Sequence, residues 1–275
     1  HIYTLSISKN DSKLDKPILT DESTMLCVGS CFNFEPILIN GATLQYRVNN
    51  GAVSFIDVYD RGVLLNSGVT RDLADGTFTL TNAPAGTITV IASTASQSLE
   101  SAALRLAQMA GYSGINWVNV SAARRAYVAG LVVMADGETY RSALQKIADS
   151  IGAYIIENTN SNELTIMCLS NIAPIPYLTD AQIIEGSIKQ IGILPAINRV
   201  LFGYTKNYRV MQQSEIAASV FSSNWSGASA LMQDRYETAA SNTIADSYEY
   251  NELDIDSVLR NLNDADAEKI YIQGK

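Results

Sequence analysis

Histidine is almost missing from this sequence of 275 residues, and its scarcity excludes a common class of catalytic site. The single histidine is His1. A Ser-His-Asp or Cys-His relay needs a histidine held within the fold, so we expect no such relay in this chain. The motif Gly111-Tyr112-Ser113-Gly114 has neither a histidine base nor the second glycine of a nucleophile elbow. It is better explained as the end of a helix and a loop.

Cysteine is scarce as well. Cys27, Cys31 and Cys168 are odd in number, which argues against a disulfide framework and favours buried, reduced thiols. Cys27 and Cys31 offer two thiolates, but a structural zinc ion needs four ligands, and neither a second pair nor a histidine follows. We therefore expect no zinc site.

The carboxylates form no recognisable site. The densest groups are Asp254 with Asp256, and Asp264 with Asp266 and Glu268, and both lack the central glycine and distal glutamate of a calcium loop. We expect Asp264 and Asp266 to cap a helix N-terminus instead. A glycosidase needs two carboxylates across a sugar, but no spacing selects a pair among the others. These others, several of which flank turns, are Glu22, Glu35, Asp57, Asp60, Asp72 and Asp75. The sequence thus nominates no catalytic, cofactor-binding or metal-ligating residue and no cofactor.

Charge is sparse and of one dominant sign. Charged residues make up 17% of the chain, and the net charge is −9. Wrapping nucleic acid needs clustered Lys and Arg, so this balance argues against sequence-specific nucleic-acid binding. No apolar run approaches the roughly 20 residues of a membrane span, and the given chain shows no signal peptide. The strand-like start at His1–Ile7 and the apolar end at Ile270–Lys275 lead us to expect that both ends continue in a longer protein.

Short alternating strands are the main feature that is present. Thr77–Thr81 and Thr87–Val90 alternate strictly, and Asn82–Gly86 lies between them. Period-two alternation places the threonines on one face and the apolar residues on the other. These apolar residues are Phe78, Leu80, Ile88 and Val90. Asn, Pro and Gly supply turn dihedrals, so we predict a hairpin with a five-residue loop.

The remaining pattern predicts strands and helices in blocks. We expect strands in Met25–Val28, Ala42–Val48 and Asn198–Tyr208, with Tyr204 in the core beside Val200 and Phe202. Helical spacing predicts one helix at Leu99–Ala110, ended by Gly111, and another at Glu138–Ile151, capped by Asp136. A hairpin follows at Ala153–Glu157 and Glu163–Leu169. Further helices are expected near Ser214–Val220 and Asp264–Ile270.

These blocks predict an α+β, β-rich fold in which two β-sandwich-like or barrel-like units flank a helix–hairpin insert. We place a β-rich domain at residues 1–95 and an α+β insert with two helices and a hairpin at 96–180. A second β-rich unit at 181–275 ends in the acidic helix and is expected to continue beyond the chain.

Three segments of the first unit resemble tail-tip or baseplate hub proteins of tailed bacteriophages. They are Val58–Val63, Asp72–Leu80 and Pro84–Val90. Ser142–Tyr154 and Asn198–Tyr208 are similar to later parts of the same proteins. The resemblance implies a non-enzymatic structural protein of the phage tail in the virion. It also implies a homotrimeric ring that contacts the tail tube, tape-measure or fibre proteins and lets DNA pass. Acidic side chains on the lumen would repel phosphates and allow that passage.

A second hypothesis is a β-rich adhesin that binds a host glycan through exposed aromatic residues. The chain has 14 tyrosines, besides Trp117 and Trp225, and tyrosine suits both sugar platforms and subunit contacts. We assign Tyr248 and Tyr250, which lie among acidic residues, to an interface rather than to a glycan. A wall hydrolase is the third and least favoured hypothesis.

Overall fold

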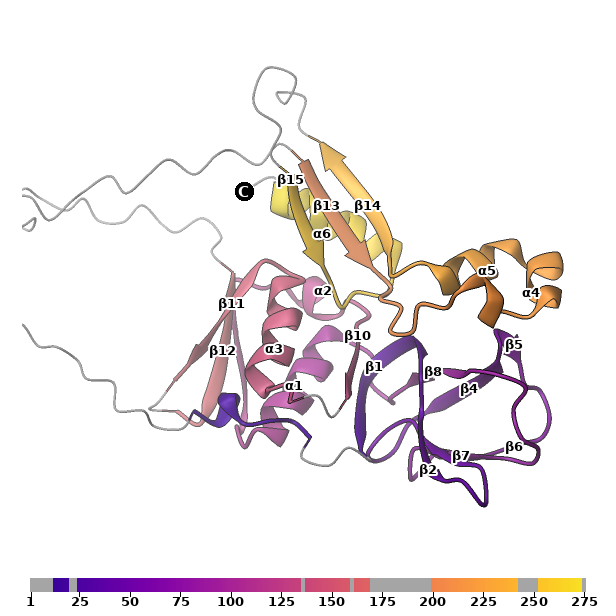
Figure 1. Cartoon of the computed structure of the whole chain (residues 1–275). Helices are drawn as coiled ribbons and strands as arrows, with labels where there is room; N and C mark the ends of the chain where they lie inside the picture. Colours follow the sequence, from indigo (N-terminus) through magenta and orange to yellow (C-terminus); the bar gives the residue numbers. More distant parts are fainter. Residues whose placement is uncertain are drawn as a thin grey trace, which may run out of the picture.

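A computed structural model describes residues 12–19, 24–134, 137–158, 161–168, 199–241 and 252–273. The described part is a β-rich α+β fold with four sheets, which confirms the predicted fold class (Figure 1). The expected strand at His1–Ile7, the tyrosines at 248 and 250, and the expected boundary at 180/181 lie outside the described residues. The division at 95/96 and 180/181 stays a prediction.

The N-terminal β unit consists of two sheets packed around one apolar core. Its strands are β1 (Met25–Phe34), β2 (Ile37–Asn40), β3 (Gln45–Arg47), β4 (Phe55–Asp60), β5 (Val63–Leu64), β6 (Val69–Asp72), β7 (Thr77–Leu80) and β8 (Ile88–Ser93). One sheet has the order β2-β3-β7-β6, and the other has the order β10-β1-β8-β4-β5. The strand β10 (Gly130–Met134) comes from later in the chain, and it completes the second sheet at its edge.

The alternating segments form β7 and β8 as predicted. The prediction that these two strands form a hairpin was wrong. β7 pairs with β3 and β6, whereas β8 pairs with β1 and β4. The 82–86 connection therefore crosses from one sheet to the other. Phe78, Leu80, Ile88 and Val90 still enter the same core, because the buried faces of both sheets point towards it. Alternation determines which face of a strand is buried, but it does not determine which strand lies next to it in the sheet.

Strand β1 is buried on both faces and divides the apolar interior in two. Met25 and Cys27 enter the core of the β unit, whereas Leu26 and Val28 enter a second, larger core. β10 behaves in the same way, with Val132 on the first side and its neighbours on the other. A strand that is buried on both faces reads as a nearly continuous apolar run, as Met25-Leu26-Cys27-Val28 does.

Two glycines allow the backbones of β1 and β10 to lie unusually close. Gly29 is opposite Gly130 in the antiparallel register, and the Ser30 amide donates to the Ala129 carbonyl at 2.8 Å. A Cβ on Gly130 would lie 1.8 Å from the Ser30 carbonyl oxygen. Gly29 also has φ +80°, which side chains disfavour. Only glycine fits this pair of positions.

The middle of the chain is an α+β layer against the second core. It comprises α1 (Leu99–Met109), β9 (Gly114–Val118), α2 (Ala122–Arg125), β10, α3 (Tyr140–Asp149), β11 (Ala153–Glu157) and β12 (Glu163–Cys168). α1 and α3 lie between the β11-β12-β9 sheet and the β1–β10 pair (Figure 1). The two helices and the β11–β12 hairpin were predicted; β9, which pairs parallel to β12, was not.

The observed helix ends refine the prediction. Gly111 has φ +92° directly after the last turn of α1, as expected of a residue beyond a C-cap. For α3 the N-cap is Thr139, whose hydroxyl accepts from the Ser142 amide. The expected cap, Asp136, lies outside the described residues. Because Thr139 starts the helix, α3 is shorter at its beginning than the spacing predicted.

The C-terminal part packs a sheet against one helix and carries a short helical hairpin. Its elements are β13 (Arg199–Tyr204), a 3₁₀ turn (Gln213–Glu215), α4 (Ala218–Ser223), α5 (Trp225–Met232), β14 (Tyr236–Ser241), β15 (Glu252–Asp256) and α6 (Leu262–Gln273). Another 3₁₀ turn, η1, lies outside this part, near the start of the described chain, and spans Lys13–Asp15. The sheet order is β14-β13-β15. Val200 and Phe202 are fully buried on β13, as predicted, and Tyr204 is partly buried.

Asp264 lies in the first turn of α6, where the helix dipole favours an anion as predicted, but in the contacts that the structure gives neither Asp264 nor Asp266 accepts from an amide of that turn. Asp264 accepts from the Val128 amide, and Asp266 accepts from the Thr238 hydroxyl and from Lys269. Both carboxylates therefore tie the helix to other elements or to its next turn. The fold brings β14 and the α2–β10 connection beside α6, and these long-range neighbours are invisible to a local pattern.

Candidate functional site

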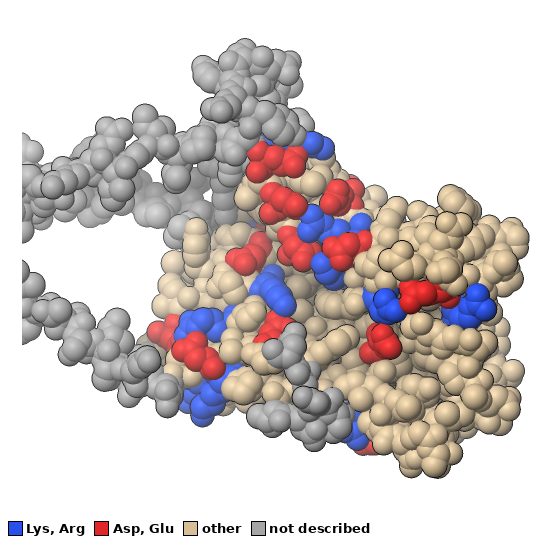
Figure 2. Space-filling model, viewed as in Figure 1, with Lys and Arg blue, Asp and Glu red and all other residues tan. Residues whose placement is uncertain are grey.

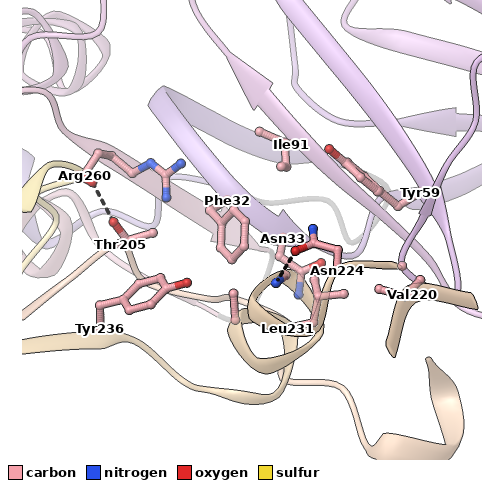
Figure 3. Close-up of a pocket in the computed structure, with 13 residues that line it drawn as sticks. Phe32, Asn33, Tyr59, Ile91, Thr205, Val220, Asn224, Leu231, Tyr236 and Arg260 are labelled. Carbon is pink, nitrogen blue, oxygen red and sulfur yellow. Dashed lines mark hydrogen bonds between the residues drawn. The ribbon is translucent and has the colours of Figure 1, made fainter. Parts of the chain in front are cut away.

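A pocket of about 370 Å³ opens where three parts of the chain meet. Phe32 and Asn33 come from the end of β1, and Tyr59 and Ile91 come from β4 and β8. The helical hairpin α4–α5 supplies Val220, Asn224 and Leu231, whereas Thr205, Tyr236 and Arg260 follow or belong to strands of the C-terminal sheet (Figure 3). The pocket thus lies between the β unit and the C-terminal part.

Two buried asparagines hold this junction together. Asn33, at φ +43°, donates from its side chain to the Asn207 side chain at 2.8 Å and to the Arg209 carbonyl at 2.7 Å. Asn207 in turn donates to three carbonyls near the end of α5, including Gln233 at 2.7 Å. Buried amides whose N–H groups are all hydrogen-bonded favour one arrangement of the backbone. They fix the hairpin α4–α5 against the end of β1.

The hairpin α4–α5 has no charged residue between Glu215 and Asp234. Figure 2 accordingly shows a tan surface, without red or blue, over these two helices. Asn224 caps α5 by accepting from the Gly227 amide, and the hairpin has a small apolar core of its own. Trp225 is 65% exposed and its ring lies 5.8 Å from that of Phe221. Exposed aromatic rings on an uncharged surface are typical of contact sites.

Arg260 is the chemically distinctive residue of the pocket. Its Nε and Nη1 atoms are buried and have no hydrogen-bond acceptor among the described residues. The guanidinium lies 5.3 Å from the centre of the Phe32 ring. The backbone is fixed, since its amide donates to the Val128 carbonyl and its carbonyl accepts from the Thr205 hydroxyl. Burial lowers the pKa of Arg260 below its usual value, because the charged form loses hydration.

The outer face of the C-terminal sheet carries the densest group of carboxylates, and these are paired with cations. Arg235 lies within 2.7 Å of Asp254 and also contacts Asp256 and Glu237. Lys206 contacts Asp234 and Asp256. Asp254 and Asp256 on β15, one of the two acidic groups that the sequence singled out, are thus paired with Arg235 and Lys206. No group of three or more His, Cys, Asp or Glu side chains that could hold a metal ion occurs in the described part.

Other residues singled out by sequence have structural contacts. Asp60 accepts from the Ala85 and Gly86 amides, and Asp72 accepts from the Ala74 and Asp75 amides. Asp72 thus shows the local turn chemistry that was expected of acidic residues at turns, whereas the partners of Asp60 lie 25 and 26 residues further along the chain. Glu35 contacts Arg209. Glu22 lies outside the described residues. Tyr112 donates to Glu157 at 2.9 Å, and Ser113 follows the Gly111 helix end as a loop residue.

The three thiols are buried and unpaired as disulfides, as predicted. The sulfur atoms of Cys27 and Cys31 lie 3.1 Å apart. The Cys27 thiol donates to the Cys31 sulfur, and this hydrogen bond together with burial raises the pKa of Cys27, so its thiol is kept in the unreactive form.

The pocket was missed by sequence reasoning because its residues are scattered from Phe32 to Arg260. The chain offered one local signal, the uncharged run around Trp225. No helix in the described ranges is long and apolar enough to cross a membrane.

Comparisons with known proteins bear on the fold. No protein-family model matches the sequence, and no curated protein matches it. Among solved structures, the chain is similar to a chain of the "virion of native gene transfer agent (GTA) particle". The TM-score is 0.51 at 11% identity, and the match covers 93% of this chain and 72% of the other. Identity at this level speaks for the fold alone, and the chain therefore shares its fold with a chain of a gene transfer agent virion.

Proposed function

We propose that this chain is a non-enzymatic structural component of a phage-like virion. The observation that carries the proposal is the fold shared with a gene transfer agent virion chain over 93% of the present sequence. Within the particle we assign it to the tail tip or baseplate hub, on the resemblance of Val58–Val63, Asp72–Leu80 and Pro84–Val90 to hub proteins of tailed phages. Copies of the chain would form a ring, a homotrimer in that family, next to tail tube, tape-measure or fibre proteins.

The charges on the C-terminal sheet suit a face that lines a channel. The sheet and its flanking turns present five carboxylates against three cations, which leaves a negative excess. The carboxylates are Asp234, Glu237, Glu252, Asp254 and Asp256, and the cations are Arg199, Lys206 and Arg235. Figure 2 shows acidic and basic side chains gathered over the region of this sheet. In a ring that turned this face inward, DNA phosphates would be repelled and would pass without adhering.

The experiment that tests the proposal is native mass spectrometry of the assembled protein, followed by electron microscopy of purified particles. We expect a symmetric ring at one end of the tail, with antibody against the chain bound there. A chain that stays monomeric at high concentration and is missing from purified particles would contradict the proposal.

A second candidate function, host-glycan binding, is favoured by Trp225. Trp225 is 65% exposed, its ring lies beside that of Phe221, and sugars stack on exposed aromatic faces. Saturable binding of the isolated chain to host surface glycans, lost in Trp225→Ala, would support this function. An equal signal from Trp225→Ala and the wild type would exclude that aromatic pair as the platform.

A further inference from the structure

Arg260 is a cation without an anion among the described residues. Arg260 has two buried nitrogens without an acceptor among the described residues, and no other described residue has more than one such atom. Arg47 has one such nitrogen, whereas two other arginines of low exposure are paired: Arg124 meets Glu268 at 2.5 Å, and Arg235 meets three carboxylates. Arg260 is half-buried as a residue, but its two buried nitrogens without acceptors destabilise the fold, and their position at an open pocket points to a ligand.

The pocket around Arg260 specifies the chemistry of that ligand. Its surroundings are uncharged, with Phe32, Leu231 and Val220 as apolar walls and Asn224, Tyr59 and Tyr236 as neutral polar groups. A single cation in uncharged surroundings favours a ligand that has one anionic group and is otherwise apolar. A guanidinium binds a carboxylate through two parallel hydrogen bonds. A nucleic acid presents a row of phosphates and needs several cations, which this pocket does not supply.

The location of the pocket indicates that the ligand is part of a protein. The walls include α4–α5, whose surface is uncharged between Glu215 and Asp234 and exposes Trp225. An apolar surface around one buried charge has the composition of the centre of a protein interface, where charged residues are otherwise depleted.

We propose that this pocket receives a segment of a neighbouring virion protein, and that an Asp or Glu side chain of the segment pairs with Arg260. The inference rests on the proposed function and adds the contact through which the chain is held. The segment carries one carboxylate between small apolar residues that lie against Phe32 and Leu231.

The first test separates a binding role from a structural one in the isolated protein. Arg260→Met removes the charge and keeps most of the volume. We expect the thermal midpoint to stay the same or to rise by about 2–4 °C, because an unpaired buried cation is removed. The matched control is Arg235→Met, which breaks three ion pairs and should lower the midpoint. A clear loss of stability in Arg260→Met would show that Arg260 supports the fold, and would overturn the inference.

The second test uses purified particles. Wild-type chain, Arg260→Met, Arg260→Lys and Arg105→Met are each supplied in place of the native copy, and the amount per particle is measured. We expect Arg260→Met to fall about tenfold or more, because a docked carboxylate loses its partner. Arg260→Lys should be partly retained, and Arg105→Met, a half-buried arginine on α1, should equal the wild type. Equal amounts of Arg260→Met and wild type would contradict the inference alone, whereas absence of the wild-type chain would contradict the proposed function.

A third measurement identifies the occupant. The photoreactive residue p-benzoylphenylalanine replaces Tyr236 at the pocket wall, particles are irradiated, and the cross-linked peptide is mapped by mass spectrometry. We expect a peptide of another chain that contains Asp or Glu, and we expect the cross-link to be lost when Arg260→Met is added. A peptide of the same chain molecule, or one without a carboxylate, would overturn the inference.

Discussion

Arg124 and Glu268 form the most deeply buried ion pair among the described residues. Arg124 donates from Nε and Nη2 to the two carboxylate oxygens, at 2.8 and 2.5 Å. Arg124 also donates to the Ile151 carbonyl and to the Cys168 sulfur. Its Cζ atom lies 3.9 Å from the centre of the Tyr271 ring. Although burial opposes its charge, the carboxylate raises the pKa of Arg124 above the usual value. One side chain thus joins α2 and α6 to the end of α3 and to β12.

We predict that Arg124→Met lowers the free energy of unfolding by about 3–5 kcal/mol, because the buried Glu268 carboxylate loses its guanidinium. The double variant Arg124→Met/Glu268→Leu should recover much of this loss, since no charge is then left in the interior. Urea denaturation of both variants and the wild type measures the difference. If the single variant is as stable as the wild type, the pair does not hold α6 in place.

At the scale of elements, the close contact between β1 and β10 depends on Gly130. We predict that Gly130→Ala destabilises the chain by at least about 2 kcal/mol, because its Cβ would lie 1.8 Å from the Ser30 oxygen and the strands must separate. The control is Gly41→Ala, where an added Cβ meets nothing within 4 Å and the expected change is within about 0.5 kcal/mol. Thermal unfolding measures both. Equal midpoints for the two variants would refute the claim that this contact is tight.

A second element-scale prediction concerns the η1 turn, which is fastened to α3 and β11 through Glu157. This carboxylate accepts from Ser12 at 2.7 Å, Tyr112 at 2.9 Å and Arg141 at 2.6 Å. Burial raises its pKa, but these bonds outweigh burial and lower the pKa below its ordinary value of 4.5. Burial, with the bond to Glu157, also raises the pKa of Tyr112 to about 12.

A carboxylate with a lowered folded-state pKa contributes stability above its ordinary pKa, and this contribution is lost as the pH falls through the folded value. The wild-type denaturation midpoint should therefore decline below about pH 4.5. In Glu157→Gln the stability at neutral pH should be lower and the acid-induced decline smaller. Glu163→Gln, which alters an exposed carboxylate on β12, serves as the control. Identical pH profiles for Glu157→Gln and the wild type would contradict the assigned role.

The elements also show what the sequence was able to predict. Alternation predicted β7, β8 and β13, and 3.6-residue spacing predicted α1 and α3, because these elements bury one face and their pattern is local. The partners of β7 and β8 were mispredicted, since many sheets satisfy the same alternation. α5 was missed because its Ser and Gly residues have low helix propensity and its stability comes from packing against α4. Arg260 carried no signal, because its unpaired state depends on side chains that come from distant parts of the chain.

At the scale of the whole molecule, the net charge of −9 governs the behaviour towards nucleic acid. We predict that the isolated chain does not retard duplex DNA in a gel at about 0.15 M salt, because phosphates meet a surface of the same sign. A basic protein of similar size serves as the positive control. A shift that weakens as salt is added would reveal a cationic site and would exclude a smooth, repelling channel.

The shared sheet of β1 and β10 also has a consequence for how the protein is made. Translation delivers Met25–Gly29 long before Gly130–Met134, so one edge of the nascent sheet emerges from the ribosome with open amides and carbonyls. Such an edge can recruit a strand from another nascent chain. Expression fragments that stop near residue 95 would keep this edge permanently open and would tend to aggregate, whereas fragments that extend past Met134 close it. Because β10 is synthesised after β1, the edge of β1 at Met25–Gly29 is covered only once Gly130–Met134 has been made.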